Sequence, residues 1–441
     1  IKPRYTMKTY DAIIIGFGKG GKTLAADLGA RGWQVAVIEQ SDQMYGGTCI
    51  NVGCIPTKTL VHQAKLATYR PEPTFGQRSE HYRRAIRRKE EVTALLRDKN
   101  YRNLADKPNI TVYTGAGSFA GPDEVDVTFT ADYPDRRSGV PDPGTAGSTN
   151  ATSGTATAKI PAGTAAGGYT KGEKLHLKAD RIFINTGAKP FVPDIPGLKQ
   201  SPRVYLSESI MELETLPRRL VILGGGYIGL EFASMFANFG SQVTILQPNQ
   251  RFLPREDLEI ADAVETSLAR RGVRLMRNTA LKEVRDEAAE TVLILKQDEM
   301  DSELRCDALL VATGRRPQLD NLHPEAAGIA LTSRGAIAVN EQLKTSVDHI
   351  WAMGDVTGGL QFTYISQDDS RIVTDALNSG PRTTANRGAV PYSVFMDPPF
   401  SRVGLSEEEA RSAGYDLKIA RIPAAAIPKA QVLRKTDGLL K

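Results

Sequence analysis

Cysteine and histidine are scarce in this chain of 441 residues, which contains three cysteines and five histidines. A structural zinc ion needs four cysteine or histidine ligands at short spacings, but only Cys49 and Cys54 lie close together, with Cys306 far away. The sequence therefore predicts no structural metal site. Few cysteines in so long a chain are typical of a reducing compartment, so we expect a cytoplasmic protein.

Long apolar runs and a strong charge are also missing. No stretch approaches the roughly 18 apolar residues of a membrane span, and no basic and then apolar leader precedes the first predicted strand. The formal net charge of +5 does not demand a nucleic acid. The basic run at residues 83–89 precedes an apolar stripe at helical spacing and is interpreted as a solvated helix face. We expect neither a membrane nor a nucleic-acid partner.

Two cysteines five residues apart stand in the segment 46–58, which reads GGTCINVGCIPTK. In a regular helix this spacing rises about 7.5 Å, beyond the ~7 Å between Cα atoms that a disulfide tolerates. A bond between Cys49 and Cys54 requires a distorted turn, which Gly53 permits. Because a bridge in such geometry is easily reduced, the segment is interpreted as a redox-active disulfide. Two ordinary buried thiols are the alternative.

A glycine turn upstream indicates a dinucleotide site. The apolar run 12–15 leads into GFGKGG and a helix-like segment. Gly16 permits the tight turn, Gly18 lets the backbone approach a pyrophosphate, and Gly21 permits close helix-strand packing. The helix N-terminus offers N–H groups to the phosphates. A second predicted strand ends at Glu39, where an acid binds a ribose hydroxyl.

The same pattern recurs at residues 220–229, where the strand LVIL precedes GGGYIG. Two such turns predict two dinucleotides. The predicted contacts in this turn are Gly224, Gly226, Tyr227, Ile228 and Gly229.

The residue after the next strand bears on the choice of nicotinamide nucleotide. Gln247 stands where an acid is expected for the ribose of NAD, and it lacks the charge that repels a 2′-phosphate. Arg251 and Arg255 favour NADPH if they face the site, and either is equally a solvated loop charge. NADH and NADPH both stay open.

A dithiol combined with two dinucleotide turns resembles the class I pyridine nucleotide-disulfide oxidoreductases, which include glutathione reductase, dihydrolipoyl dehydrogenase and mercuric reductase. The resemblance runs from about residue 8 to the C-terminus, apart from one insertion. It implies FAD and NADPH or NADH as cofactors, with hydride passing to the flavin and electrons passing on to the disulfide. It also implies that Cys54 faces the flavin and that Cys49 attacks the acceptor.

Short motifs support this resemblance. Residues 185–188 and 312–317 resemble the strand-turn motifs that close the FAD and NAD(P) lobes, and residues 350–356 resemble the second FAD segment. Lys58 and Glu231 match an ion pair beside flavin N5, or else are helix-surface charges. The resemblance implies further flavin contacts from Gly47, Thr48, Lys58, Thr186, Gly187, Gly354 and Asp355, and an NAD(P) contact from Gly314.

Five segments resemble one branch of the family, whose members are described as copper(II) reductases of the reactive-chlorine response. These segments are 16–19, 43–47, 58–62, 252–257 and 358–366. In the last, most of the wider family carries a Leu-Ala-His-like sequence over the flavin pyrimidine, which this chain lacks. The branch implies Cu(II) as acceptor, with the two cysteines as a transient copper site. Mercuric reductase, glutathione-like disulfide reductase, dihydrolipoyl dehydrogenase, and an idle flavoprotein fragment serving as redox sensor or binding module are the alternatives.

Strands and helices alternate around each glycine turn, which predicts two doubly wound α/β domains. We expect an FAD domain at 1–196, an NAD(P) domain at 197–322, the rest of the FAD domain at 323–388, and the start of an α+β interface domain at 389–441. Residues 138–172, rich in small and polar residues, are predicted to be a flexible hairpin tip or else a linker.

The C-terminal domain is expected to be incomplete. Interface domains of the family continue further and carry a His-Pro segment, followed by a Glu, that reaches the partner's dithiol. The sequence stops at Lys441 before such a segment. The homodimer of the family is therefore an open expectation for this chain.

Overall fold

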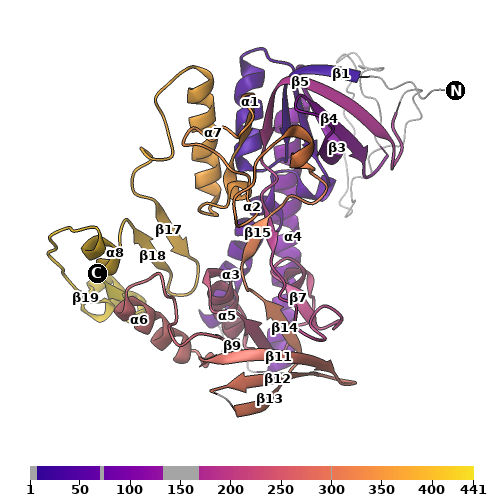
Figure 1. Cartoon of the computed structure of the whole chain (residues 1–441). Coiled ribbons are helices and arrows are strands. Elements are labelled where there is room, and N and C mark those ends of the chain that lie inside the picture. The colour runs from indigo at the N-terminus through magenta and orange to yellow at the C-terminus, as the bar shows by residue number, and fades with distance from the viewer. Residues whose placement is uncertain (1–6, 70–73, 133–167, 299) are drawn as a thin grey trace, which may run out of the picture.

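The computed structural model describes residues 7–69, 74–132, 168–298 and 300–441. Three parts are visible in Figure 1: a first lobe around a six-stranded sheet, a second lobe around a five-stranded sheet, and a C-terminal lobe formed by residues 389–441. Most of the segment predicted at 138–172 lies outside the described residues. The doubly wound α/β class is confirmed.

The first sheet is centred on β1, which runs parallel to β2 on one side and to β5 on the other. The first half of β3 continues the parallel sheet beside β2, and its second half pairs antiparallel with β4. β4 pairs antiparallel with β5, as expected for a hairpin, and β16 joins parallel to β5. The strands are β1 (Met7–Ile15), β2 (Val35–Glu39), β3 (Ile110–Phe119), β4 (Glu124–Phe129), β5 (Lys174–Ile184) and β16 (Ile350–Ala352).

Helices cover this sheet and connect it to the rest of the molecule. α1 follows the first glycine turn and packs against α7, a helix from late in the sequence (Figure 1). The helices are α1 (Lys19–Ala30), α2 (Thr48–Asn51), α3 (Cys54–Tyr69), α4 (Phe75–Ala105) and α7 (Thr363–Leu377). Short 3-10 turns are η1 (Asp42–Met44), η3 (Ser209–Glu212), η4 (Pro324–Ala327), η5 (Gly354–Thr357) and η6 (Ala424–Ala426).

The second sheet is parallel, with the order β10-β9-β8-β14-β7, and it is flanked by an antiparallel meander of β11, β12 and β13. A short antiparallel pair, β6 with β15, connects the two lobes. The elements are β6 (Ala188–Pro190), β7 (Val204–Leu206), β8 (Arg219–Leu223), α5 (Tyr227–Phe239), β9 (Gln242–Leu246), α6 (Leu258–Ala269), β10 (Arg274–Met276), β11 (Thr279–Asp286), β12 (Thr291–Gln297), β13 (Met300–Cys306), β14 (Ala308–Val311) and β15 (Arg315–Pro317).

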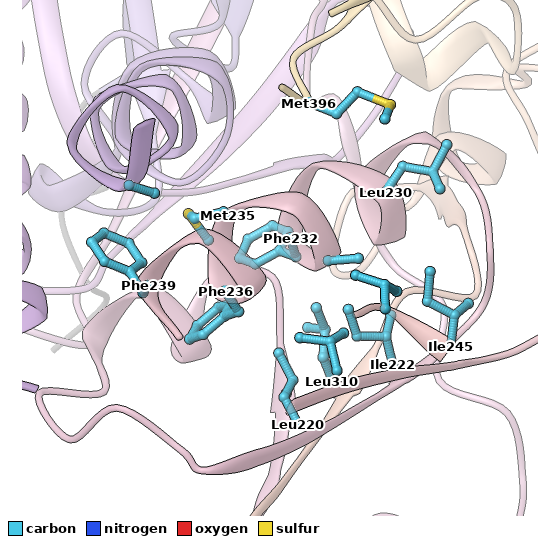
Figure 2. Packing of buried hydrophobic residues seen from close by; sticks show 14 of the residues in the cluster. Leu220, Ile222, Leu230, Phe232, Met235, Phe236, Phe239, Ile245, Leu310 and Met396 are labelled. Atoms are coloured by element: carbon cyan, nitrogen blue, oxygen red, sulfur yellow. The ribbon is translucent and has the colours of Figure 1, made fainter. Parts of the chain in front are cut away.

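Helix α5 is buried on nearly all sides, as a helix that is apolar around its whole circumference must be. Figure 2 shows Phe236 and Phe239 on this helix, with Leu220 and Ile222 of the sheet nearby and Met396 of the C-terminal lobe above it. Each buried aromatic or aliphatic side chain contributes about 1.5–3 kcal/mol. The same core therefore holds the second lobe together and docks the C-terminal lobe on it.

The C-terminal lobe is anchored through Asp397, whose side chain is buried. Its carboxylate forms ion pairs with Lys435 at 2.8 Å and with Lys65 of α3 at 3.6 Å, and its backbone N–H donates to Ser234 of α5. The elements of this lobe are β17 (Pro391–Val394), β18 (Phe400–Val403), α8 (Glu407–Ser412), β19 (Ile422–Pro423), α9 (Pro428–Leu433) and β20 (Leu439–Leu440). None of the described helices is both long and apolar enough to cross a bilayer.

Candidate functional site

A cavity of about 1340 Å³ lies where the three lobes meet. It is larger than the roughly 300–1,000 Å³ of a typical site for one ligand, as a site for two dinucleotides must be. Both glycine turns and both clustered cysteines contribute to its wall. The lining includes these predicted residues: Gly16, Gly18, Glu39, Gly47, Thr48, Cys49, Cys54, Lys58, Thr186, Gly187, Gly224, Gly226, Tyr227, Ile228, Glu231, Gln247, Gly314 and Asp355.

Three predicted contact residues lie behind the wall instead. A Cβ on Gly21 would meet the carbonyl oxygen of Gly16 at 2.5 Å, and a Cβ on Gly229 would meet that of Gly224 at 2.2 Å. Both glycines serve helix-strand packing. Gly354 is buried, and its N–H donates to Asp369 Oδ2 at 2.7 Å, so it supports the segment that holds Asp355.

The first glycine turn is shaped to receive a phosphate-bearing ligand. α1 begins after Gly18 without a side-chain cap. The N–H of Gly20 donates to Ser366 Oγ and that of Gly21 to Asn185 Oδ1, so among the first three helical N–H groups that of Lys19 is the one open to an anion. Asn185 supports this turn from below, because its Oδ1 accepts from Gly21 N at 2.8 Å and its Nδ2 donates to Met353 O at 2.7 Å. Sequence reasoning placed Asn185 in a motif but gave it no role.

Unpartnered polar groups in the wall fit a ligand rich in hydroxyl and carbonyl groups. Within the described part of the chain, Arg315 Nε and Gln318 Oε1 are buried without a hydrogen-bond partner. Burial raises the pKa of Asp355 to about 6 and that of Glu39 to about 7. Buried polar groups need partners, and the ribityl and ribose hydroxyls of FAD supply them. The residues present therefore fit FAD.

The second turn opens into the same cavity. α5 begins after Gly226, where a Cβ would meet nothing within 4 Å. Gln247 Oε1 accepts a hydrogen bond from Gly225 N at 3.3 Å, so part of the hydrogen-bonding capacity of this side chain is satisfied by the glycine turn itself. Arg251 pairs with Glu408 at 3.0 Å, whereas the Arg255 side chain lines the cavity and forms no ion pair with any described residue.

The helix is interrupted between the two cysteines, as their spacing led us to expect. α2 ends at Asn51, and α3 begins at Cys54 after Val52 and Gly53. Cys54 Sγ lies 3.4 Å from Thr363 Oγ1 at the start of α7.

The two sulfurs differ chemically. Both are half-buried free thiols. A hydrogen bond from Cys49 lowers the pKa of Cys54, and Thr363 and Lys58 act in the same direction. The same hydrogen bond, together with burial, raises the pKa of Cys49. Cys54 is therefore the sulfur that ionises first.

Lys58 and Glu231 form no ion pair in this structure, and their role beside the flavin stays a prediction. Neither residue has an ion-pair partner among the described residues, and Phe395 of the C-terminal lobe contacts both. The Lys58 ammonium lies 3.8 Å from the centre of the Phe395 ring, and Glu231 Oε1 accepts from Phe395 N at 2.9 Å. Burial raises the pKa of Glu231, while the Phe395 N–H and nearby Lys58 oppose that shift.

Sequence reasoning also missed several residues of the cavity wall. Tyr392 and Phe395 come from the C-terminal lobe, Glu256 from the loop before α6, and Thr363 from the first turn of α7. Glu256 and Thr363 belong to segments 252–257 and 358–366, which resemble one branch of the family. No motif spacing in the sequence singles out any of these four residues.

Comparisons with known proteins agree with this geometry. The family model for pyridine nucleotide-disulphide oxidoreductases matches residues 10–370, and the model for the dimerisation domain of that family matches residues 390–441. The chain is 48% identical to the probable pyridine nucleotide-disulfide oxidoreductase RclA of Escherichia coli, over 99% of this chain and 86% of that protein. Identity is 31% to a mercuric reductase of Lysinibacillus sphaericus, over 98% of this chain and 71% of that one.

Solved structures extend the likeness to three dimensions. The HOCl-induced flavoprotein disulfide reductase RclA from E. coli matches with a TM-score of 0.81 and 47% identity, covering 98% of this chain and 86% of that chain. The Cu(II) complex of the same protein matches with the same values. This chain therefore belongs to the pyridine nucleotide-disulfide oxidoreductase family and is an NAD(P)H-dependent flavin disulfide oxidoreductase that uses FAD.

Proposed function

We propose that this enzyme passes electrons from NADPH or NADH through FAD to a Cys49–Cys54 disulfide, and from the dithiol to Cu(II), in defence against reactive chlorine. One observation carries the proposal: both cysteines lie in the wall of the cavity that also contains both glycine turns. The likeness to RclA, which has a solved Cu(II) complex, supports copper as the substrate.

The residues of this chain have separate roles in the proposal. The bound FAD and nicotinamide nucleotide supply hydride and electron transfer. Cys54, with its lowered pKa, is the thiolate that faces the flavin, and Cys49 is the thiol that meets the acceptor. Two Cu(II) ions take one electron each from the Cys54 thiolate and the Cys49 thiol, which become a disulfide while Cys49 releases one proton. Soft Cu(I) suits thiolate ligands.

The competing acceptors differ in their proton chemistry. Reduction of glutathione disulfide or lipoamide releases thiolates that take up protons, whereas one-electron reduction of a soft metal ion needs mainly the thiolate pair. The match of residues 390–441 to the dimerisation domain supports a homodimer. Arg255, which is free to meet a 2′-phosphate, supports NADPH over NADH.

An anaerobic titration of the flavin-loaded protein with NADPH, and separately with NADH, tests the electron path. We expect a long-wavelength charge-transfer absorbance after two electrons, because the Cys54 thiolate would lie against oxidised flavin. Bleaching of the flavin without that band would mean that the dithiol is uncoupled.

Steady-state reduction of Cu(II) by Cys49→Ser tests the acceptor. We expect copper reduction to be lost while flavin stays bound, with Cys306→Ser as the matched control, because Cys306 is buried outside the cavity wall. Mercuric ion, oxidised glutathione and lipoamide are the competing acceptors. An idle sensor would bind FAD and consume no NAD(P)H with any of them.

A further inference from the structure

Four aromatic rings form a stack along one wall of the cavity. Tyr364 stacks on Phe362 with 5.3 Å between ring centroids, Phe362 on Tyr392 with 5.6 Å, and Tyr392 on Tyr227 with 5.5 Å. All four residues line the cavity. Phe362 and Tyr364 belong to the first lobe, Tyr227 to the second and Tyr392 to the C-terminal lobe, so Tyr392 is the ring that joins the other two lobes.

One buried carboxylate holds two of these rings together. The hydroxyl groups of Tyr227 and Tyr392 both donate to Glu256 Oε1, at 2.6 and 2.5 Å. Glu256 is only 2% exposed. Burial and the Glu256 carboxylate raise the pKa of Tyr227, which keeps this hydroxyl protonated as a donor.

The second oxygen of the carboxylate is held by the C-terminal lobe. Arg402 Nη1 lies 3.4 Å from Glu256 Oε2 and donates to the Arg255 carbonyl at 2.8 Å. Arg402 pairs with Tyr392 across the strands β17 and β18. One hairpin therefore presents both the tyrosine and the arginine to Glu256.

The aromatic stack extends from the surroundings of Cys54 to the second glycine turn. Phe362 immediately precedes Thr363, whose hydroxyl contacts Cys54. Tyr227 immediately follows Gly226 of the second glycine turn. The sheets of the two large lobes share no strand among the described residues, and a two-stranded pair links them.

The two large lobes also share a buried core, in which Tyr82 of α4 packs against Phe236 and Phe239 of α5. That core sets the mean arrangement of the lobes, and the stack acts locally at the cavity. Hydride transfer is sensitive to small local displacements, because reacting atoms must lie about 3–3.5 Å apart and a 1 Å misplacement can cost about a hundredfold in rate.

We propose that Tyr392 and Glu256 form a positioning pair that fixes the nicotinamide subsite relative to the flavin and the dithiol. The inference rests on the proposed placement of the nicotinamide nucleotide at the second glycine turn. Tyr392 supplies the ring that stacks between the lobes. Glu256 accepts hydrogen bonds from the hydroxyl groups of Tyr227 and Tyr392 and so fixes the two rings relative to each other. Neither residue takes part in the reaction.

Three variants separate the parts of this arrangement. Tyr392→Phe keeps the ring and loses its hydrogen bond, Tyr392→Leu loses both, and Glu256→Gln weakens both bonds. Tyr415→Leu is the control, because Tyr415 is an aromatic residue of the same lobe that is 62% exposed. The first measurement is stopped-flow reduction of the flavin at saturating NADPH and NADH, with protonated and deuterated nicotinamide. The second is hydrogen exchange of segments 251–257 and 391–403 in the flavin-loaded protein without nucleotide.

We expect Tyr392→Leu to lower the rate constant at saturation by about tenfold or more while a deuterium isotope effect persists. Tyr392→Phe and Glu256→Gln should lower it several-fold, and both segments should exchange faster in all three variants but not in the control. A rate constant that stays unchanged at saturation, even with a lowered thermal midpoint, would show a purely structural role and overturn the inference.

If Tyr392→Leu does not fold, the other two variants decide the question. A wild-type flavin that neither nucleotide reduces would overturn the proposed function and this inference together. Normal reduction in the wild type with unaffected variants would overturn the inference alone.

Discussion

The buried carboxyl group of Glu39 in the cavity wall has a raised pKa that a bound ligand would change. Glu39 Oε2 accepts from Phe17 N at 3.0 Å, and burial still raises the pKa of Glu39 to about 7. A buried carboxylate is costly unless donors surround it, and the hydroxyl groups of a ribose are such donors. Without the ligand, this residue destabilises the fold at neutral pH.

Glu39→Gln should therefore stabilise the flavin-free protein above neutral pH. The folded pKa of about 7 exceeds the ordinary value of 4.5, so the folded state holds its proton more tightly. Stability must then fall as pH rises from about 4.5 to 7, by at most about 3 kcal/mol, and glutamine escapes this loss. Urea unfolding at pH 4.5 and pH 8 measures the effect, which should appear at pH 8 only. Glu91→Gln, at an exposed site, is the control; an equal difference at both pH values would contradict the assignment.

Among the elements, the interrupted helix pair α2 and α3 depends on a close approach to the first glycine turn. Gly47 has φ 76°, and a Cβ there would meet the Cα of Gly18 at 2.6 Å. This contact joins the dithiol segment to the phosphate-binding turn, so the two elements act as one unit of the site.

Gly47→Ala should separate these elements and release the flavin. Gly272→Ala is a matched control, because Gly272 has φ 77° but a Cβ there meets nothing within 4 Å. The cost of the backbone conformation, about 1–2 kcal/mol, is the same in both variants. We expect flavin content after purification to fall at least tenfold in Gly47→Ala and to stay near wild type in Gly272→Ala. Equal flavin content in the two variants would show that the close approach is unimportant.

At the scale of the whole molecule, the site is complete only when the C-terminal lobe is docked. That lobe supplies Phe395, which contacts Lys58 and Glu231, and Tyr392 of the aromatic stack. Docking depends on the buried core around α5 and on Asp397, which is 3% exposed.

Asp397→Asn should loosen the docking. It removes the charge that Lys435 and Lys65 pair with, and because both lysines are partly exposed we expect a loss of about 1–3 kcal/mol, below the 3–5 kcal/mol of a fully buried pair. Asp194→Asn is the matched control, since Asp194 pairs with Lys199 at 3.0 Å but is 97% exposed, and should cost less than about 1 kcal/mol. Urea unfolding measures both, and similar losses in the two variants would argue against an anchoring role.

The sequence by itself determined the family, the doubly wound lobes and the location of the chemistry. The two glycine turns and the broken helix at Cys49 and Cys54 could be predicted because the requirement is local. A tight turn, a phosphate or a short sulfur-sulfur approach restricts neighbouring residues, and that restriction is visible as spacing.

Only the tertiary structure decided which distant side chains complete the site. Phe395 lies more than 150 residues from Glu231 and over 300 from Lys58, yet it contacts both. Thr363 reaches Cys54 across 309 positions, and Tyr392 reaches Glu256 across 136. Such contacts depend on how three lobes dock, and docking is set by buried surface summed over many residues, which leaves no periodic or spaced signal at the residues that finally meet.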